Sequence, residues 1–231
     1  MNLLILLQQV ATQVAGPEAQ AVPEKMNLWK MTTYGGPIII LLGIMLAIAV
    51  YIFIERLITI NKASREDKSF MNRIKDYIHE GKIDSARKLC RDTDSPASRM
   101  VEKGITRLGR PMNDVLIAVE NVGNLEVSKL EKSLVILATI SGGAPMLGFL
   151  GTVTGMVLVF YNMTLNTTGV VQLIDLSSGM YQAMVTTVGG LIVGILAYFG
   201  YNYLISRIDS VVRNLEAKTL EFMDLLNEPV N

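Results

Sequence analysis

Hydroxyl and amide side chains inside long apolar runs are the residues of this chain whose types and spacing could do chemistry. Thr152 lies in the run GFLGTVTG, and Gln182 and Thr187 lie in the run YQAMVTTVGG. Within a bilayer such groups pair with protein or water rather than with lipid tails, so they mark packing contacts or the wall of a polar path. We therefore take these three as candidates for lining a polar path, together with two small neighbours, Ala183 and Gly190.

Two stripes of small residues accompany these polar groups. One stripe follows the spacing i, i+4, i+7, i+11 on a single helix face and consists of Ala183, Thr187, Gly190 and Gly194. The other set of helix-packing candidates consists of Pro145, Gly148, Gly151 and Gly155. Close helix packing alone would explain the small residues, and a lone threonine commonly bonds to its own backbone. Two facing stripes with threonines at comparable depth favour the alternative, a lined channel.

No combination of residues indicates an enzyme or a metal centre. The chain shows no paired carboxylates, no Ser/His/Asp set and no Gly-Lys-Ser/Thr phosphate loop, so we expect no catalytic residue and no cofactor. His79 is the single histidine and Cys90 the single cysteine, which argues against a metal site and an internal disulfide. Charged residues crowd into 55–132 and the C-terminal tail, which is typical of bilayer partitioning and not of nucleic-acid binding.

The elements that must position these residues are helices that cross a membrane. Half of the 231 residues are hydrophobic, and Asp175 is the only formally charged residue between Lys132 and Arg207. Each of the two runs in this region exceeds the ~20 apolar residues needed to span a bilayer. We predict an all-α membrane protein with three transmembrane helices, the second and third long and extending into the cytoplasm as a helical bundle. The expected organisation is an outer N-terminal segment over 1–30, spans over 31–55, 133–164 and 179–206, a helical region over 56–132, a link over 165–178 and a C-terminal helix over 207–231.

Breaks in the predicted soluble region separate short helices over about 66–80, 84–93, 97–108 and from 112 onward. Ser95 followed by Pro96 predicts a capped helix start. No proline occurs between Asn113 and Pro145, so the sequence predicts one continuous rod that runs from the soluble region into the second span. Apolar residues keep a helical rhythm from 205 to 226, which predicts that the third helix also continues past the membrane.

Lysine and arginine near the span ends predict the orientation. Arg56, Lys62, Lys132 and Arg207 would all lie on one side, whereas the link over 165–178 contains no basic residue. The positive-inside rule then places 56–132 and the tail in the cytoplasm, with the N-terminus and the link outside. Residues 1–25 form either a signal peptide or a short interfacial helix. The second is favoured because no basic residue precedes a very short apolar core.

The segments APMLGFLGTVTGM (144–156) and GMYQAMVTTVGGLIVGILAYFGYN (179–202) resemble the MotA/TolQ/ExbB proton channel family. Three spans fit the ExbB/TolQ branch, because the MotA branch has four. The resemblance implies a homopentamer in the bacterial inner membrane whose pore holds the membrane helices of two ExbD-like or TolR-like single-span partners. Proton flow would then drive work on a TonB-like envelope protein. By position, Thr152 and Thr187 match the pore threonines, and Pro145, Gly148 and Gly151 match turn and packing residues.

Two residues depart from the family pattern. Gln182 stands where many members have glutamate, and Leu196 stands where many have proline. Glutamine cannot take up and release a proton near neutral pH, so the titrating group would be an aspartate on the partner. Leucine should leave the third span straighter than proline would. Three alternatives stay open: a TolQ-like subunit for envelope maintenance, a non-conducting oligomeric scaffold, and a solute transporter. The last is disfavoured by three spans without an inverted repeat. The missing carboxylates leave both protons and sodium ions open, and the family resemblance favours protons.

Overall fold

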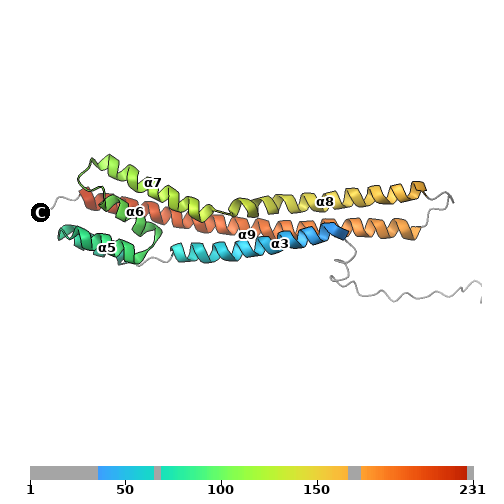
Figure 1. Ribbon diagram of the computed structural model, residues 1–231, viewed down its shortest axis with the longest axis horizontal. Helices are drawn as coiled ribbons and strands as arrows, with labels where there is room; N and C mark the ends of the chain where they lie inside the picture. The colour runs from blue at the N-terminus through green and yellow to red at the C-terminus, as the bar shows by residue number, and fades with distance from the viewer. Residues whose placement is uncertain (1–35, 65–68, 166–172, 228–231) are drawn as a thin grey trace, which may run out of the picture.

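The protein is an elongated bundle of helices, as a computed structural model shows (Figure 1). The structure describes residues 36–64, 69–165 and 173–227, and every element within them is an α-helix. This confirms the predicted all-α class. The interpretations of 1–30, of the link residues 166–172 and of the tail from 228 concern residues outside the described part of the chain. The side chain of Asp175 lies outside it as well.

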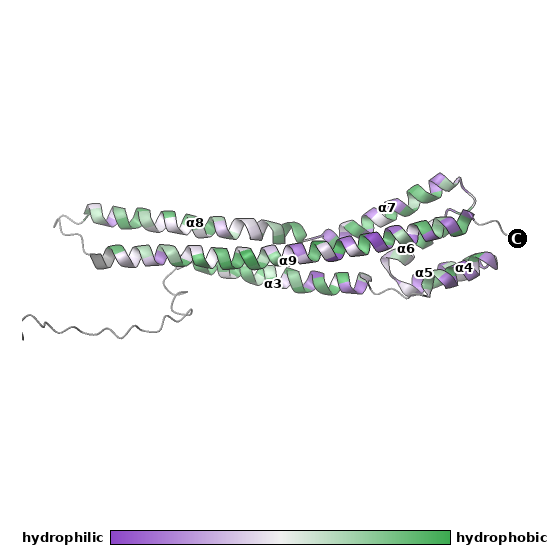
Figure 2. Ribbon diagram, turned by 180° about the vertical axis from the view of Figure 1, so that it is seen from behind, coloured by the Kyte–Doolittle hydropathy of each residue, from purple (hydrophilic) through white to green (hydrophobic). Residues whose placement is uncertain are grey.

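Three stretches of the described chain are long and apolar enough to cross a membrane by length and composition. They lie in α3 (Gly36–Ser64), in α8 (Leu134–Leu165) with the helix before it, and in α9 (Leu173–Asn227). Figure 2 shows mainly hydrophobic and weakly polar residues along α8 and the paired part of α9, and more strongly hydrophilic residues toward the other end of α9. Phe149 is 66% exposed and Phe199 is 68% exposed. A surface of this kind is matched by lipid or by neighbouring protein rather than by water.

Helix α9 is the central rod of the molecule, and its 55 residues confirm that the third helix continues past the apolar stretch. Buried positions at helical spacing on the polar side include Leu204, Ile208, Val211, Leu215 and Phe222, and Met223 and Leu225 are buried as well. The outer part of α9 pairs with α8. Helix α3 covers only the part of this pair that lies nearer the polar end, and the tips of α8 and α9 extend beyond it (Figure 1).

A compact bundle closes the polar end. It consists of the end of α9 and four further helices, α4 (Phe70–His79), α5 (Ile83–Thr93), α6 (Pro96–Ile105) and α7 (Met112–Glu131). Each helix buries one apolar face, and the fully buried side chains include Phe70, Ile74, Val101, Val119 and Phe222. The predicted breaks are found at Gly81 and Gly109, which have φ values of 69° and 85°. These left-handed values favour glycine and end the helices that precede them.

The start of α6 confirms the predicted cap. The Ser95 hydroxyl accepts a hydrogen bond from the Ser98 amide at 3.1 Å, and the Ser98 hydroxyl accepts one from the Ser95 amide at 2.9 Å. This reciprocal capping box satisfies two main-chain donors, while Pro96 in the first turn has no N–H that needs a partner.

The predicted continuous rod from α7 into α8 is wrong. Helix α7 ends at Glu131, Lys132 is extended with φ −51° and ψ 137°, and Ser133 has a positive φ of 70° before α8 begins at Leu134. In an unbroken helix the Lys129 carbonyl would accept from the Ser133 amide. Here it accepts instead from the side chain of Arg56 on α3, at 3.0 Å. A contact from another part of the chain thus replaces the local hydrogen bond. We call residues 132–133 the elbow.

Candidate functional site

The candidate site is the contact between α8 and the outer part of α9. Gly148 on α8 and Gly190 on α9 bring the two backbones together at its centre. A Cβ at Gly190 would lie 2.6 Å from the Ala144 carbonyl oxygen and 2.8 Å from the Gly148 Cα, so main-chain atoms block any side chain there. A Cβ at Gly148 would lie 2.9 Å from the Thr186 carbonyl oxygen. Small residues permit this approach, which gains van der Waals contact along both helices.

The other predicted packing residues extend this contact in both directions. A Cβ added at Gly151 would collide with the Thr186 side chain, and one added at Gly155 would come close to Ala183, so these residues are their neighbours on α9. Pro145 fits against Gly194, where a Cβ would lie 2.5 Å from the proline Cγ. Proline removes one backbone hydrogen bond from α8, and the missing side chain at 194 leaves room for its ring. The structure therefore brings the two predicted stripes face to face within one chain.

Two neighbouring threonines of α9 lie in this contact, and the hydroxyl of each donates a hydrogen bond to a main-chain carbonyl. Thr187 is half-buried and donates across the interface to the Gly148 carbonyl at 3.0 Å. Thr186 is 2% exposed and donates to the Ala183 carbonyl of its own helix at 2.6 Å. Sequence reasoning selected Thr187 and missed Thr186. The adjacent threonines at 186 and 187 could have indicated this from the sequence. Successive residues differ by about 100° around a helix, so only one of the two can point directly at the partner helix.

The other predicted pathway residues are placed differently. Thr152 is half-buried and donates to the Phe149 carbonyl of its own helix at 2.6 Å. Gln182 is exposed and lies on the side of α9 that faces α3, where its Nε2 would be 3.1 Å from a Cβ at Gly36. Ala183 is 3% exposed and Gly190 is buried against α8. The described chain therefore gathers Thr187, Ala183 and Gly190 in one contact and sets Gln182 apart from them.

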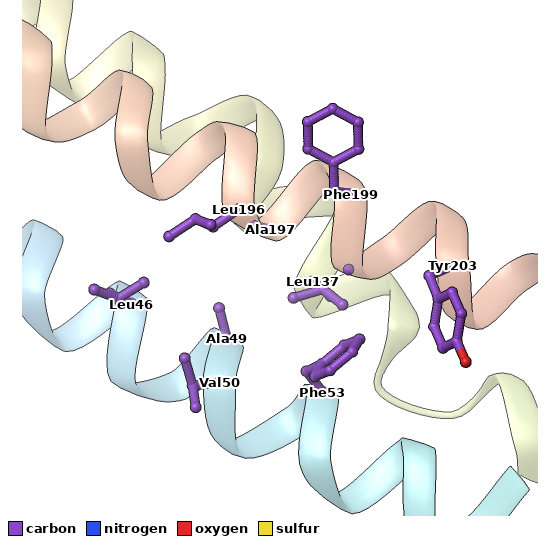
Figure 3. A pocket seen from close by; sticks show the side chains of 10 residues that line it. Leu46, Ala49, Val50, Phe53, Leu137, Leu196, Ala197, Phe199 and Tyr203 are labelled. Atoms are coloured by element: carbon purple, nitrogen blue, oxygen red, sulfur yellow. The ribbon is translucent and has the colours of Figure 1, made fainter. Parts of the chain in front are cut away.

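An apolar cavity of about 370 Å³ lies between α3, α8 and α9, next to the elbow (Figure 3). Side chains from α3, among them Leu46 and Phe53, face Leu137 and Leu196 across it, and Tyr203 is the lining residue with a polar atom in its side chain. Leu196 is the residue that replaces the proline of the family pattern. Its lining contains no group that titrates near neutral pH and no set of ligands for an ion, so it is a gap in packing and not a chemical site.

The groups that carry charge lie at the elbow and in the polar bundle. Glu126 on α7 is 4% exposed and accepts from Arg99 at 2.7 Å and from Lys129 at 2.6 Å. Burial raises the pKa of the Glu126 carboxyl, but the hydrogen bonds from Arg99 and Lys129 outweigh burial and hold that pKa below its ordinary value. Arg56 is 7% exposed. Sequence reasoning missed both roles, because nothing local distinguishes these residues from solvated charges.

The chemistry available to the α8–α9 contact is limited to hydrogen bonding. No ionisable side chain other than tyrosine occurs in α8 or between 176 and 206 of α9. Within the described residues, no three His, Cys, Asp or Glu side chains are grouped as metal ligands. The contact offers hydroxyl oxygens and a smooth, close-packed surface, and it has no group that exchanges a proton near neutral pH.

Comparison with known proteins gives a consistent picture. The sequence model of a family described as the MotA/TolQ/ExbB proton channel family matches residues 92–217. A putative biopolymer transport protein ExbB homolog of Methanothermobacter thermautotrophicus is 29% identical over 191 residues, which cover 81% of this chain and 66% of that protein. The biopolymer transport protein ExbB of Neisseria gonorrhoeae is 23% identical over 88% of this chain and 99% of its own length. The Tol-Pal system protein TolQ of Pseudomonas aeruginosa is 29% identical over 52% of this chain and 51% of its own length.

Proposed function

The chain belongs to the MotA/TolQ/ExbB proton channel family, and from this premise we propose that it forms the wall of a proton-conducting complex in the bacterial inner membrane. Several copies, five by the family resemblance, surround the membrane helices of ExbD-like or TolR-like single-span partners. Proton flow through the complex does work on a TonB-like envelope protein. The chain is the static part of this machine and the partner is the titrating part.

The observation that carries this proposal is the absence of any carboxylate from α8 and from residues 176–206 of α9. A complex that moves protons down the membrane potential needs a group that binds and releases them, and this subunit contributes none in its apolar part. An aspartate on the partner helix supplies that group. Each proton that crosses ~100 mV makes about 2.3 kcal/mol available, which is comparable to breaking a few hydrogen bonds.

The hydrogen bonds of the threonines favour one protonation state of this partner aspartate. A hydroxyl has one proton to donate and two lone pairs that accept. The protons of Thr152 and Thr187 are already donated to the carbonyls of Phe149 and Gly148, so what remains is the ability to accept. A protonated carboxyl donates to such an oxygen, whereas a carboxylate cannot. Where these oxygens face the lumen, they favour the neutral form of the partner, which is the form that can pass apolar walls.

The outward faces of α8 and α9 support assembly into a ring. Large apolar side chains cover both helices, and the most exposed of them include Met146 at 74% and Phe199 at 68%. An apolar surface this continuous is matched either by lipid or by the same surface of another copy. Native mass spectrometry should therefore give a complex with about five copies of the 25.4 kDa chain. A monomer that conducts no ions would exclude the ring.

Proton flux through reconstituted complexes tests the conduction directly. We expect vesicles that contain the chain and its partner to acidify under an applied potential, and vesicles with the chain alone to remain unchanged. Thr187→Val and Gln182→Ala test whether these side chains take part. Thr139→Val is the matched control, because its exposed hydroxyl donates to the Val135 carbonyl on the same helix, away from the α8–α9 contact. Unchanged flux in both test variants would remove Thr187 and Gln182 from the pathway.

A Tol-Pal role is the second candidate, because a relative named TolQ matches half of the chain. The two roles share the same channel and differ in the envelope protein that is driven. Co-purification with a TonB-like protein would favour the first role, and co-purification with another component of a Tol-Pal system would favour the second. Absence of proton flux together with a stable ring would favour the non-conducting scaffold instead.

A further inference from the structure

The elbow between α7 and α8 is held by a side chain from α3. Ser133 joins the two helices with a φ of 70°, and it is one of two non-glycine residues with a positive φ in the described chain. A left-handed residue between two right-handed helices costs about 1–2 kcal/mol, so something outside the elbow must stabilise it. The local sequence offers neither glycine nor proline at positions 132 and 133.

The break frees carbonyl groups at the C-terminal end of α7. The last carbonyls of any helix lack an intrahelical donor, and the Lys129 carbonyl is one of them because Ser133 turns away. Arg56 donates to this oxygen from Nη1 at 3.0 Å. Its other donors, Nε and Nη2, bind both carboxylate oxygens of Glu55 at 2.8 Å and 2.6 Å. The guanidinium thus places a positive charge at the negative end of the α7 dipole, which is the favourable arrangement.

The low exposure of Arg56 shows that its side chain is enclosed in this contact. Arg56 is 7% exposed although it lies on a helix whose outer face is open, and Glu55 beside it remains partly exposed. A buried guanidinium is tolerated only where its charge is paired and its donors are used. Glu55 provides the charge. Glu55 leaves the guanidinium nitrogen Nη1 without an acceptor. In an exposed arginine this nitrogen would bind water, and here the Lys129 carbonyl accepts from it.

The contact continues from the elbow into the polar bundle. The Lys129 side chain binds Glu126, Glu126 binds Arg99 on α6, and Arg99 binds Asp94, which has a φ of 42° just before the Ser95 cap. Ion pairs of this kind resist separation when one member is buried, as Glu126 is. The α7 end is therefore fixed to the rest of the bundle, and Arg56 is the link from that rigid end to the membrane helix α3.

We propose that Arg56 is a positioning residue that sets the direction in which α8 leaves the elbow. By holding the end of α7 against α3, it fixes the angle between the polar bundle and α8, and so the orientation of the face that carries Gly148 and Thr152. The effect on conduction rests on the proposed function. The geometric claim does not, because it concerns the angle between two helices of one chain.

Spin-label distances measure that angle. Labels at Ile117→Cys on α7 and Phe149→Cys on α8 report it, because both positions are exposed and lie on opposite sides of the elbow. The buried Cys90 is replaced by serine, and labelled chains are diluted with unlabelled ones so that each distance comes from a single chain in a full complex in nanodiscs. We expect one narrow distance in the parent protein. In Arg56→Gln, the ratio of this population to displaced ones should fall roughly tenfold, as expected for a lost charge-assisted hydrogen bond.

Two further variants separate positioning from general stability. Arg56→Lys keeps a cation near the Lys129 carbonyl and should restore most of the narrow distance. Lys62→Gln removes the same charge from an exposed position of α3 and should leave the distance unchanged. An unchanged distance in Arg56→Gln, or an equal change in Lys62→Gln, would overturn the proposal. Failure of both Arg56 variants to assemble would also overturn it, because the residue would then be required for folding.

Proton flux links the angle to function. In complexes with the partner, Arg56→Gln should lower flux roughly in proportion to the lost population, and Arg56→Lys should recover it. Normal flux with a displaced distance would show that α8 orientation is irrelevant to conduction and would overturn the functional half of the proposal. If the parent complex carries no protons, the proposed function fails, and the spin-label distances still decide the role of Arg56.

Discussion

Gly190 shows at the scale of one residue why the hairpin of α8 and α9 needs glycine. A Cβ there meets the Ala144 carbonyl oxygen and the Gly148 Cα, which are main-chain atoms that cannot rotate away. Gly190→Ala should therefore separate the helices and destabilise the protein by about 1–3 kcal/mol, the usual range for overpacking. Thermal unfolding in detergent measures the effect. Gly142→Ala is the control, because a Cβ at Gly142 meets nothing within 4 Å. Equal stability of the two variants would contradict the close approach.

Glu126 makes the polar bundle sensitive to acid. Its pKa is lowered in the folded protein, so its contribution to stability is complete above about pH 4.3, the ordinary value for glutamate, and is lost as pH falls through the lower folded-state value. Glu126→Gln should lower the unfolding free energy at pH 7 by about 1–3 kcal/mol and flatten its dependence on pH below 5. Thermal melts between pH 3 and 8 test this. The exposed Glu120 on the same helix provides the control, and a pH dependence of Glu126→Gln equal to that of the parent would refute the assignment.

The elbow is the feature that matters most at the scale of the elements, and Ser133 is its test. Glycine adopts a φ of 70° without strain, so Ser133→Gly should keep the bend and preserve stability. A β-branched residue is strained there, so Ser133→Val should cost about 1–2 kcal/mol or straighten the junction. Thermal unfolding and the spin-label distance between α7 and α8 report the two effects. Ser206→Val in the helical interior of α9 is the control, with an expected cost of at most ~0.7 kcal/mol. A straighter junction in Ser133→Gly would argue against the bend.

Pro145 shows how a second element accommodates an irregularity in the first. Proline in a helix interior removes a hydrogen bond and usually kinks the helix. Here α8 continues through it from Leu134 to Leu165, and Gly194 of α9 leaves space for the ring. The irregular residue of one helix and the smallest residue of the other therefore occur at matching positions.

At the scale of the whole molecule, the polar bundle and the tips of α8 and α9 lie at opposite ends (Figure 2). The distribution of basic residues predicts that the bundle is cytoplasmic. Cysteine labelling tests this in a Cys90→Ser background with Tyr161→Cys near the tip of α8 and Leu220→Cys in the bundle, at positions that are 58% and 64% exposed. A membrane-impermeant maleimide should label Tyr161→Cys in intact spheroplasts and Leu220→Cys only after lysis. The reverse pattern would invert the topology.

The native cysteine should interfere little with such labelling. Burial raises the pKa of the Cys90 thiol to about 12, and the nearby Glu102 adds to the effect. Only the thiolate reacts readily with maleimides, so the parent protein should remain almost unlabelled near neutral pH while it is folded.

The sequence by itself determined the number of apolar helices, the all-α class, the family and the small-residue stripes. These follow from hydropathy and helical periodicity, which act over a few turns and are therefore visible in the chain. The tertiary structure alone decided which side each polar residue faces and that the chain breaks at the elbow between α7 and α8. At the break before Ser133 the Lys129 carbonyl accepts from Arg56, 77 positions before Ser133 in the chain, and the buried Glu126 accepts from Arg99 of another helix. Gln182 and Thr187 face different helices, because α3 packs on one side of α9 and α8 on another. Contacts between distant segments carry no local signature, because the same residues on an isolated helix would simply face water.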